Sequence, residues 1–229
     1  MKIAIIITGI IHEYLLDDLI KCYIDCKYIK IISTWNYIDK NIIDKLKENN
    51  FLIIQSNFPK NMDNNSVNYQ NYSTKVGIEY ASSLNLSLTH FLRIRGDLSC
   101  NNINRLLEIY SYIYEDEKYI FLLHFHNDPS GYLVDYCYFS NINNSKKYWC
   151  NFLEFNDKRF RFTEQFLQEL CFGTNDLNII NNYVIYSGKY LLEENIDLFW
   201  LKKEHRHEGN EMVIQCLNKW NNIHGYLSF

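Results

Sequence analysis

The sequence predicts an α/β fold: a Rossmann-like, three-layer α/β/α architecture with a mainly parallel central sheet. Two observations indicate it. Strand-like and helix-like segments alternate through the first hundred residues, and the strand-like segments are apolar runs short enough to be buried strands. Strands joined by helices favour parallel pairing, because the helix returns the chain to the edge where the previous strand began. We therefore expect helices on both faces of the sheet.

Four strands and three helices are expected in the first half of the chain. The strands are short apolar runs, and the helices have apolar residues every three or four positions. A polar stretch at 59–66 separates the third strand from the third helix. The expected strands are 2–8, 29–34, 51–56 and 91–94, and the expected helices are 13–27, 36–49 and 67–84.

The second half has weaker signals. Its clearest feature is the turn sequence Asn-Asp-Pro-Ser-Gly at 127–131, which predicts a strand pair on either side. Asn101 or Asn102 is suited to cap a helix, because a short amide side chain accepts from the free amides of the first turn. The expected helices are 101–114, 143–155, 163–172 and 209–221, and the expected strands are 118–126, 131–140 and 183–186.

Composition bounds the class of protein. The 229 residues suit one domain, and a net charge of -4 gives no basic field that would attract nucleic acid. Seven cysteines without a Cys-x-x-Cys pair predict reduced thiols in the cytoplasm. No segment reaches the roughly 20 apolar residues of a membrane span.

The most informative motif follows the fourth strand. Arg93 and Arg95 alternate along it, Gly96 permits a sharp turn, and Asp97 follows. A carboxylate at the carboxyl end of a central strand points into the crevice where α/β proteins bind ligands, and it is a natural ligand for a hard cation. An internal ion pair at the strand end is the alternative, and the two interpretations are compatible.

Polar residues also follow the first two strands. Thr8 and Gly9 end the first strand, where they either contact a nucleotide or simply form a turn. The second strand ends in Ser33, Thr34 and Trp35, whose hydroxyls and indole suit a ribose or a ring, although Trp35 suits the core equally. The chain has neither a G-x-G-x-x-G nor a G-x-x-x-x-G-K-[ST] motif, which counts against dinucleotide binding and P-loop chemistry.

The start of the third helix is polar. Gln70 and Thr74 lie there and are candidates for contacting a diphosphate, assisted by the helix dipole. A solvated helix face explains them nearly as well.

Three further residues are candidates for chemistry. Asp135 lies within an apolar strand, where a carboxylate is costly without a partner; the alternative is a hydrogen bond to a tyrosine. Glu164, just inside a helix, is either a general base or a capping carboxylate. His205 is a candidate metal ligand, a surface loop being the alternative.

The order of these motifs resembles that of WavE-type glycosyltransferases, including relatives in large DNA viruses. The resemblance covers most of residues 1–172. It rests on Ser33-Thr34-Trp35 and on the segments 68–77, 92–97, 134–140 and 163–165.

The resemblance implies a GT-A fold in which a D-x-D motif binds Mn²⁺ or Mg²⁺ and the diphosphate of a nucleotide sugar. In this chain the first acidic position of that motif is Arg95, and Asp97 alone remains. Residues 1–100 are then the nucleotide-binding half of a single domain, and 101–229 the acceptor-side half. With the candidates taken from the sequence pattern, the metal ligands are then Asp97 and His205, and the donor contacts are Thr8, Gly9, Ser33, Thr34, Trp35, Gln70, Thr74, Arg93 and Arg95.

The implied reaction transfers a sugar to a hydroxyl of a glycan, a lipid-linked molecule or a small molecule. An inverting enzyme needs one carboxylate to deprotonate that hydroxyl, and Glu164 and Asp135 are the candidates. A lipid-linked acceptor would hold the protein at a membrane without a span. The alternative function is a non-catalytic protein that binds nucleotides or carbohydrates, which the loss of the first acid favours.

Overall fold

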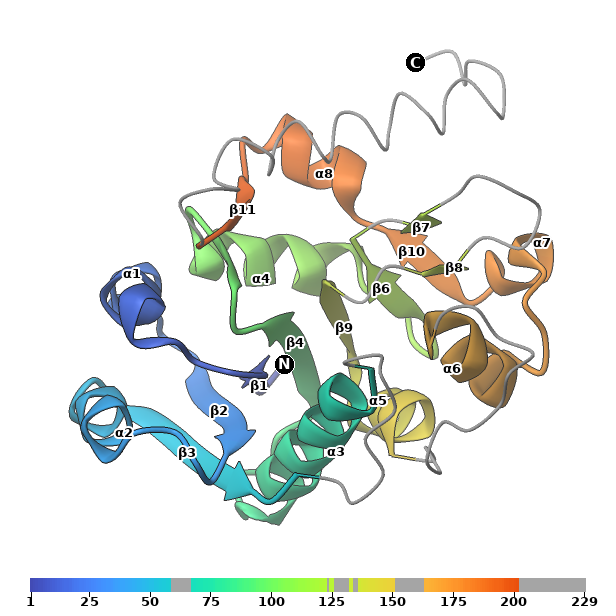
Figure 1. Ribbon diagram of the computed structural model, residues 1–229. Coiled ribbons are helices and arrows are strands. Elements are labelled where there is room, and N and C mark those ends of the chain that lie inside the picture. The colour runs from blue at the N-terminus through green and yellow to red at the C-terminus, as the bar shows by residue number, and fades with distance from the viewer. Residues whose placement is uncertain (59–66, 123, 126–131, 134–135, 151–162, 202–229) are drawn as a thin grey trace.

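Three strand-helix units build the first part of the fold. In the computed structural model, residues 1–58, 67–122, 124–125, 132–133, 136–150 and 163–201 are described. The units run in the order β1 (Ile3–Thr8), α1 (Glu13–Tyr23), β2 (Ile29–Trp35), α2 (Lys40–Glu48), β3 (Phe51–Ser56), α3 (Val67–Ser83) and β4 (His90–Arg95) (Figure 1).

The rest of the described chain contains shorter elements. They are β5 (Leu98–Cys100), α4 (Ile103–Ile113), β6 (Tyr119–Phe121), β7 (His124–Phe125), β8 (Tyr132–Leu133), β9 (Cys137–Asn141), α5 (Ile142–Trp149), α6 (Thr163–Phe172), α7 (Leu177–Ile180), β10 (Val184–Tyr186), α8 (Gly188–Glu193) and β11 (Leu198–Trp200).

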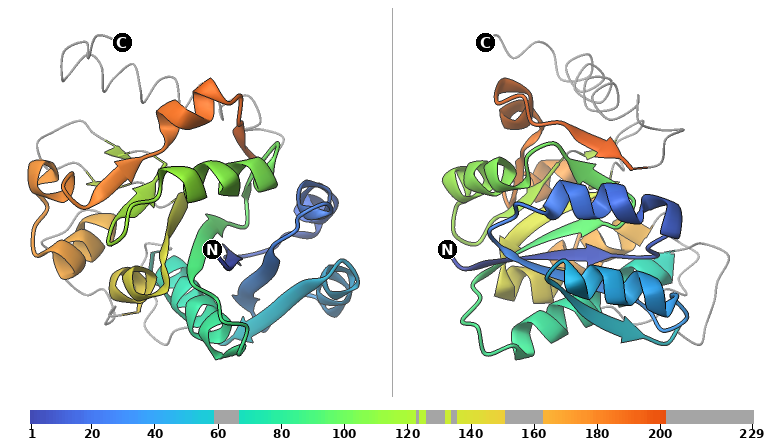
Figure 2. Two further views of the ribbon diagram at one scale, coloured as in Figure 1. Left: turned by 180° about the vertical axis from the view of Figure 1, so that it is seen from behind. Right: turned by 90° about the vertical axis from the view of Figure 1, so that its left-hand side faces the viewer.

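The central sheet has seven strands in the order β10-β6-β9-β4-β1-β2-β3. Four neighbouring pairs are parallel, and β9 is antiparallel to both β4 and β6. Figure 2 shows the sheet between its helices. The expectation of a three-layer α/β architecture with a mainly parallel sheet is confirmed.

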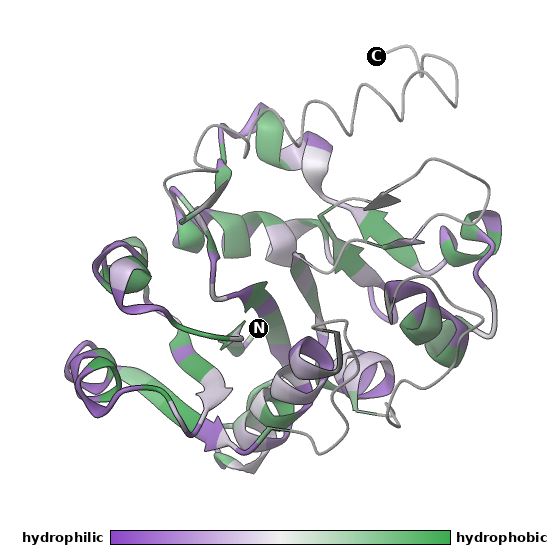
Figure 3. Cartoon of the chain, viewed as in Figure 1, coloured by the Kyte–Doolittle hydropathy of each residue, from purple (hydrophilic) through white to green (hydrophobic). Residues whose placement is uncertain are grey.

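Two apolar clusters lie on opposite faces of the sheet. The first packs Ile5 and Ile7 of β1 against α1, α2, α4 and α8, and the second packs Ala4 and Ile6 against α3, α5 and α6. Successive residues of a strand point to opposite faces, so one apolar strand supplies both clusters. Figure 3 shows the resulting concentration of apolar residues along the central strands.

Hydrogen bonds at helix ends explain the observed boundaries of α1, α2 and α4. Asp39 caps α2 by accepting from the amide of Asn41, so this helix begins at Lys40 and not at residue 36. Helix α1 ends at Tyr23, four residues earlier than expected, where Cys26 N donates to the Tyr23 carbonyl. Asn102 caps α4 by accepting from Arg105 N, as expected.

The expected strand pair is split between two sheets. Strand β6 pairs with β9 in the main sheet, whereas β7 pairs with β8 in a separate ribbon. The sequence analysis missed β5, β11, α7 and α8; β5 and β11 pair with each other across about a hundred residues of sequence. The expected helix 209–221, the expected loop 59–66 and the end of the helix 143–155 lie outside the described residues.

None of the described helices is both long enough and apolar enough to cross a bilayer.

Candidate functional site

The strand order reverses between β1 and β4. From β1 the chain moves to β2 and β3 through α1 and α2 on one face, and it then returns through α3 on the other face to β4, on the far side of β1. The turn that leaves β4 meets the end of β1, where Gly96 N donates to the Thr8 carbonyl at 2.8 Å. In open α/β sheets, ligands bind in the crevice at this switch point, outside the carboxyl ends of the strands.

Three polar side chains lie in register at this point. Thr8 at the end of β1 pairs with Ser33 of β2 on one side and with Arg95 of β4 on the other. All three point to the face covered by α3, because they continue the alternation of Ile6, Ile31 and Phe91. The predicted donor contacts Thr8, Ser33 and Arg95 are thus brought together.

Thr8 is 2% exposed, and its Oγ1 has no hydrogen-bond partner among the residues that the structure describes. Burying a hydroxyl without a hydrogen bond is unfavourable by about 1–3 kcal/mol on protein scales. A ligand group or a water molecule that reached this hydroxyl would remove that penalty.

Backbone hydrogen bonds fix the loop after β1. Gly9 N donates to the Ser33 carbonyl at 3.2 Å, and Thr34 Oγ1 donates to the Gly9 carbonyl at 2.8 Å. Gly9 has φ +111°, a conformation that a residue with a side chain rarely adopts. The predicted contacts Gly9 and Thr34 therefore fix the loop at the carboxyl end of β1.

Helix α3 covers the same edge closely. Ser33 Oγ donates to the Ser73 carbonyl at 2.6 Å, and Thr74 Oγ1 donates to the Gln70 carbonyl at 2.7 Å. A Cβ atom on Gly77 would lie 2.6 Å from Ile6 Cγ2, so glycine is needed for this approach. Both Ser33 and Thr74 are buried; the Ser33 hydroxyl joins β2 to α3, whereas the Thr74 hydroxyl bonds within α3.

Asn71 is a residue that the sequence analysis missed. It is 2% exposed, and its Nδ2 has no hydrogen-bond partner within the described part of the chain. Asn71 belongs to the buried stripe of α3 with Thr74, Ile78 and Ala81, at spacings of three and four. A polar residue in an apolar stripe was the signal that could have identified it.

Arg95 and Asp97 form a bidentate ion pair. Arg95 Nε and Nη2 donate to Asp97 Oδ1 and Oδ2, each at 3.0 Å, and the two side chains are 24% and 20% exposed. The guanidinium carbon also lies 5.5 Å from the ring centre of Tyr136. The predicted ion pair at the end of the strand is confirmed for these two residues.

Arg93 lies deeper on the same face of β4. It is fully buried, and its guanidinium carbon is 5.1 Å from the ring centre of Trp149 on α5. Arg93 also pairs in register with Tyr138 of β9. It therefore adds positive charge beneath the crevice and does not line its mouth.

Trp35 is covered by other aromatic rings. The ring of Phe58 stacks on it at 4.7 Å and that of Tyr72 at 6.2 Å, and Trp35 is only 1% exposed. Tyr37 continues the stack beyond Phe58 at 4.9 Å and is 50% exposed. A ligand approaching this stack meets Tyr37 before Trp35.

The predicted chemical groups of the second half are only partly described. Glu164 lies in the first turn of α6 and is half-buried. Asp135 and His205 lie outside the described residues. A catalytic role for Glu164 or Asp135 therefore stays a prediction.

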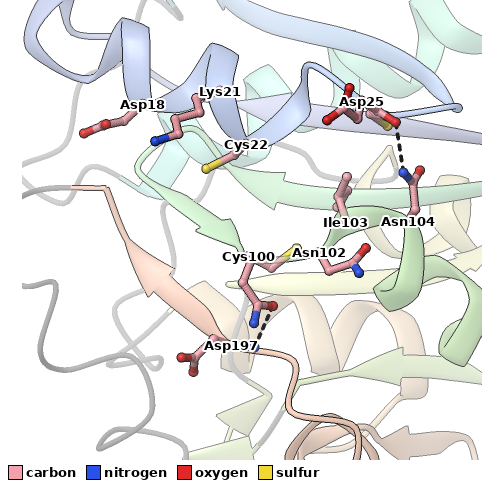
Figure 4. A pocket seen from close by; sticks show the side chains of 11 residues that line it. Asp18, Lys21, Cys22, Asp25, Cys100, Asn102, Ile103, Asn104 and Asp197 are labelled. Atoms are coloured by element: carbon pink, nitrogen blue, oxygen red, sulfur yellow. Dashed lines mark hydrogen bonds between the residues drawn. The ribbon is translucent and has the colours of Figure 1, made fainter.

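A cavity of about 770 Å³ lies elsewhere, between α1, the start of α4 and the segment before β11 (Figure 4). Cys22, Cys26 and Cys100 line it, and burial raises the pKa of each thiol, so the neutral form is favoured. Among the described residues, none that was predicted for the site lines this cavity. A hydrogen bond from Asn104 Nδ2 to the Asp25 carbonyl joins α4 to the segment after α1 in its wall.

The chain is similar to known proteins in structure and not in sequence. No family model matches the sequence, and no curated protein matches it. A glycosyltransferase involved in the glycosylation of the major capsid of PBCV-1 has a TM-score of 0.48 and 15% identity, over 94% of this chain and 100% of that one.

Two further solved structures are similar. The 4-diphosphocytidyl-2C-methyl-D-erythritol synthase of Anaerococcus prevotii has a TM-score of 0.45 and 12% identity, over 76% of this chain and 83% of that one. Core-mannan synthase A of Aspergillus fumigatus, in a Mn/GDP form, has a TM-score of 0.42 and 9% identity, over 88% and 76%. These similarities assign no substrate to this chain.

The described residues do not fit a divalent cation at Asp97. Both oxygens of that carboxylate are engaged by Arg95, and a guanidinium stands where the D-x-D motif has its first acid. Mg²⁺ is held in proteins through one or two carboxylates, with waters and substrate phosphates as its other ligands, so Asp97 would have to be the anchoring carboxylate. Within the described ranges, no group of three or more His, Cys, Asp or Glu residues is placed to hold a metal ion.

Proposed function

We propose that the protein is a GT-A glycosyltransferase that transfers a sugar from a nucleoside-diphosphate donor to a hydroxyl of a glycan, lipid-linked or small-molecule acceptor. One observation carries the proposal. Segments 33–35, 68–77 and 92–97, on which the resemblance to WavE-type glycosyltransferases rests, are far apart in sequence yet meet around the switch point of one sheet. Packing alone gives no reason for these polar segments to meet at the ligand-binding edge.

The donor site follows from the polar groups at this edge. Thr8 Oγ1 and Asn71 Nδ2 are buried polar atoms that a nucleotide would satisfy, and Arg95 supplies positive charge beside Thr8. The loop at Gly9 lies at the carboxyl end of β1. Of the other predicted donor contacts, Ser33 joins β2 to α3 and Thr34 joins β2 to the loop at Gly9, whereas the bond from Thr74 to the Gln70 carbonyl lies within α3.

The reaction requires charge stabilisation. As the bond between the anomeric carbon and the diphosphate oxygen breaks, its electron pair stays on that oxygen, and positive groups at the site stabilise the anion. The acceptor oxygen bonds to the anomeric carbon and loses its proton. In an inverting reaction a carboxylate takes that proton, and Glu164 and Asp135 are the candidates.

The first test is a thermal-shift and calorimetric screen of UDP-, GDP-, TDP- and CMP-sugars. We expect one nucleotide to raise the melting temperature, since a ligand of the native state stabilises it by mass action. Thr8→Val should weaken that binding about three- to tenfold, the effect of losing one hydrogen bond. Thr89→Val is the matched control, because it makes the same change at the amino end of β4, opposite to the carboxyl ends where Thr8 lies. Absence of binding by every nucleotide would contradict the proposal.

The second candidate function is a non-catalytic nucleotide- or carbohydrate-binding protein. The closed pair of Arg95 and Asp97 favours it, because the pair occupies the carboxylate that the related motif uses in catalysis. Release of free nucleotide from the bound donor, measured over hours, discriminates between the two. Turnover that Glu164→Gln abolishes without weakening donor binding supports the enzyme and its base; binding without turnover supports the second function.

A further inference from the structure

We propose that the guanidinium of Arg95, oriented by Asp97, takes the place of a divalent cation beside the donor diphosphate. This inference rests on the proposed function and concerns the same site. It makes Asp97 a positioning residue for Arg95 and not a metal ligand.

The first step of the argument is the geometry of the pair. Nε and Nη2 of Arg95 each lie 3.0 Å from a different oxygen of Asp97. A metal ion at Asp97 would be a second cation beside the guanidinium that already holds both carboxylate oxygens through charge-assisted bonds, which are among the stronger hydrogen bonds in proteins. Asp97 is three-quarters or more buried, so water screens the pair only in part.

The second step is that Arg95 is already fixed. Asp97 holds one edge of the guanidinium, the ring of Tyr136 lies 5.5 Å from its carbon, and Thr8 is its register partner on β1. A group held on several sides loses little freedom when a ligand binds. The ion pair therefore prepares Arg95 for an anion at the switch point.

The third step is chemical. A guanidinium is always charged and has five N–H donors in a planar fork that matches phosphate oxygens. Two of these donors bond to Asp97, and a phosphate oxygen would accept from the same planar fork. Arg93 lies two residues before Arg95 on the same face of β4, and its guanidinium adds a second positive charge beneath the site.

The charge balance supports the assignment. Arg93, Arg95 and Asp97 together carry one net positive charge, whereas two acids in a D-x-D motif would carry two negative charges and need a cation to accept a diphosphate. When the anomeric C–O bond breaks, the electron pair remains on the diphosphate oxygen, and Arg95 N–H groups stabilise it. The proton lost by the acceptor goes to the base, so no other reactant is needed.

The test measures binding of UDP, GDP and TDP by titration calorimetry, once in EDTA and once in Mn²⁺. We expect wild type to bind one of them with dissociation constants within twofold in the two buffers. Arg95→Gln should weaken binding about tenfold or more in both, the effect of losing a charged hydrogen bond. Arg95→Asp, which restores the missing acid, should bind only in Mn²⁺.

Arg105→Gln is the matched control. Arg105 makes an ion pair with Glu194 at 2.7 Å on the surface of α4, away from the switch point, so its loss should leave nucleotide affinity unchanged. Thermal unfolding of each variant shows that it is folded, and the comparison of wild type in two buffers needs no variant.

Two results would overturn the inference while the proposed function stands: wild-type binding that EDTA weakens tenfold or more, and an Arg95→Gln variant with unchanged affinity. No binding of any of the three nucleotides in either buffer would instead overturn the proposed function. The two failures are therefore distinguishable.

Discussion

The amide of Gly96 donates a hydrogen bond of 2.8 Å to the carbonyl oxygen of Thr8. This bond joins the turn after β4 to the end of β1, and it brings the loop that presents Asp97 against the first strand. A Cβ atom on Gly96 would lie 2.7 Å from Ile11 Cδ1 and 3.3 Å from the Thr8 carbonyl oxygen. A side chain at position 96 would therefore force Ile11 to shift and would press against the Thr8 carbonyl.

Gly96→Ala should lower the free energy of unfolding by about 1–3 kcal/mol, the usual effect of overpacking, as measured by urea denaturation. Ile11→Val removes the Cδ1 atom that the new methyl group meets. The double variant should therefore be more stable than the sum of the two single effects predicts. Strict additivity would contradict the contact, and the pair Gly77→Ala with Ile11→Val, on opposite faces of the sheet, is the additive control.

Gly77→Ala should destabilise the protein by about 1–3 kcal/mol even though alanine is the better helix former. The new Cβ would meet Ile6 Cγ2 at 2.6 Å and Ser33 Cβ at 3.0 Å, and neither atom is the end of a flexible chain. Chemical denaturation checks this, with Glu79→Ala on the exposed side of the same helix as control. A Gly77→Ala variant as stable as wild type would contradict the close packing of α3.

Lys30→Met should cost about 1–3 kcal/mol of stability, because it removes the donor to two carbonyl groups while it keeps the side chain's length. Lys30 is 5% exposed, and its Nζ donates to the carbonyls of Tyr23 at 3.2 Å and Asn49 at 3.0 Å. Lys45→Met, which removes an exposed ion pair with Asp17, should cost about 0–1 kcal/mol. Equal effects of the two substitutions in urea melts would contradict the prediction.

Stability should fall as the pH decreases from 7 to 5, in part because of His90. Burial is the largest cause that lowers the pKa of His90 below its ordinary value of 6.5, and the positive amino terminus adds to it. The native state then binds fewer protons than the unfolded state below pH 6.5. The contribution of His90 is therefore complete above that pH and is lost as the pH falls toward the lowered pKa of the native state.

His90→Phe tests this contribution. The ring of His90 stacks on Phe139 at 5.5 Å, so phenylalanine keeps the aromatic contact and removes the titration. The slope of unfolding free energy against pH between 5 and 6.5 should become smaller in the variant. An unchanged slope in denaturation series at several pH values would show that His90 does not contribute.

The sequence alone determined the fold class and the strands and helices from β1 to β4. Short apolar runs became strands because each supplies both faces of a buried sheet, and helix spacing identified α1 to α4. The cap at Asn102 and the ion pair of Arg95 with Asp97 were also within reach, because both join residues only two or three positions apart. Interactions of this kind are encoded in the local sequence.

The tertiary structure decided what depends on distant residues. Strand β9 pairs between β4 and β6, and β5 pairs with β11 across about a hundred residues, because burial of complementary surfaces and not local pattern selects such partners. The same packing buries Asn71 Nδ2 and Thr8 Oγ1 without a hydrogen-bond partner among the described residues, and it covers Trp35 with other rings. Sequence spacing identified polar residues at strand ends, but only the order and register of the strands brought them to one crevice.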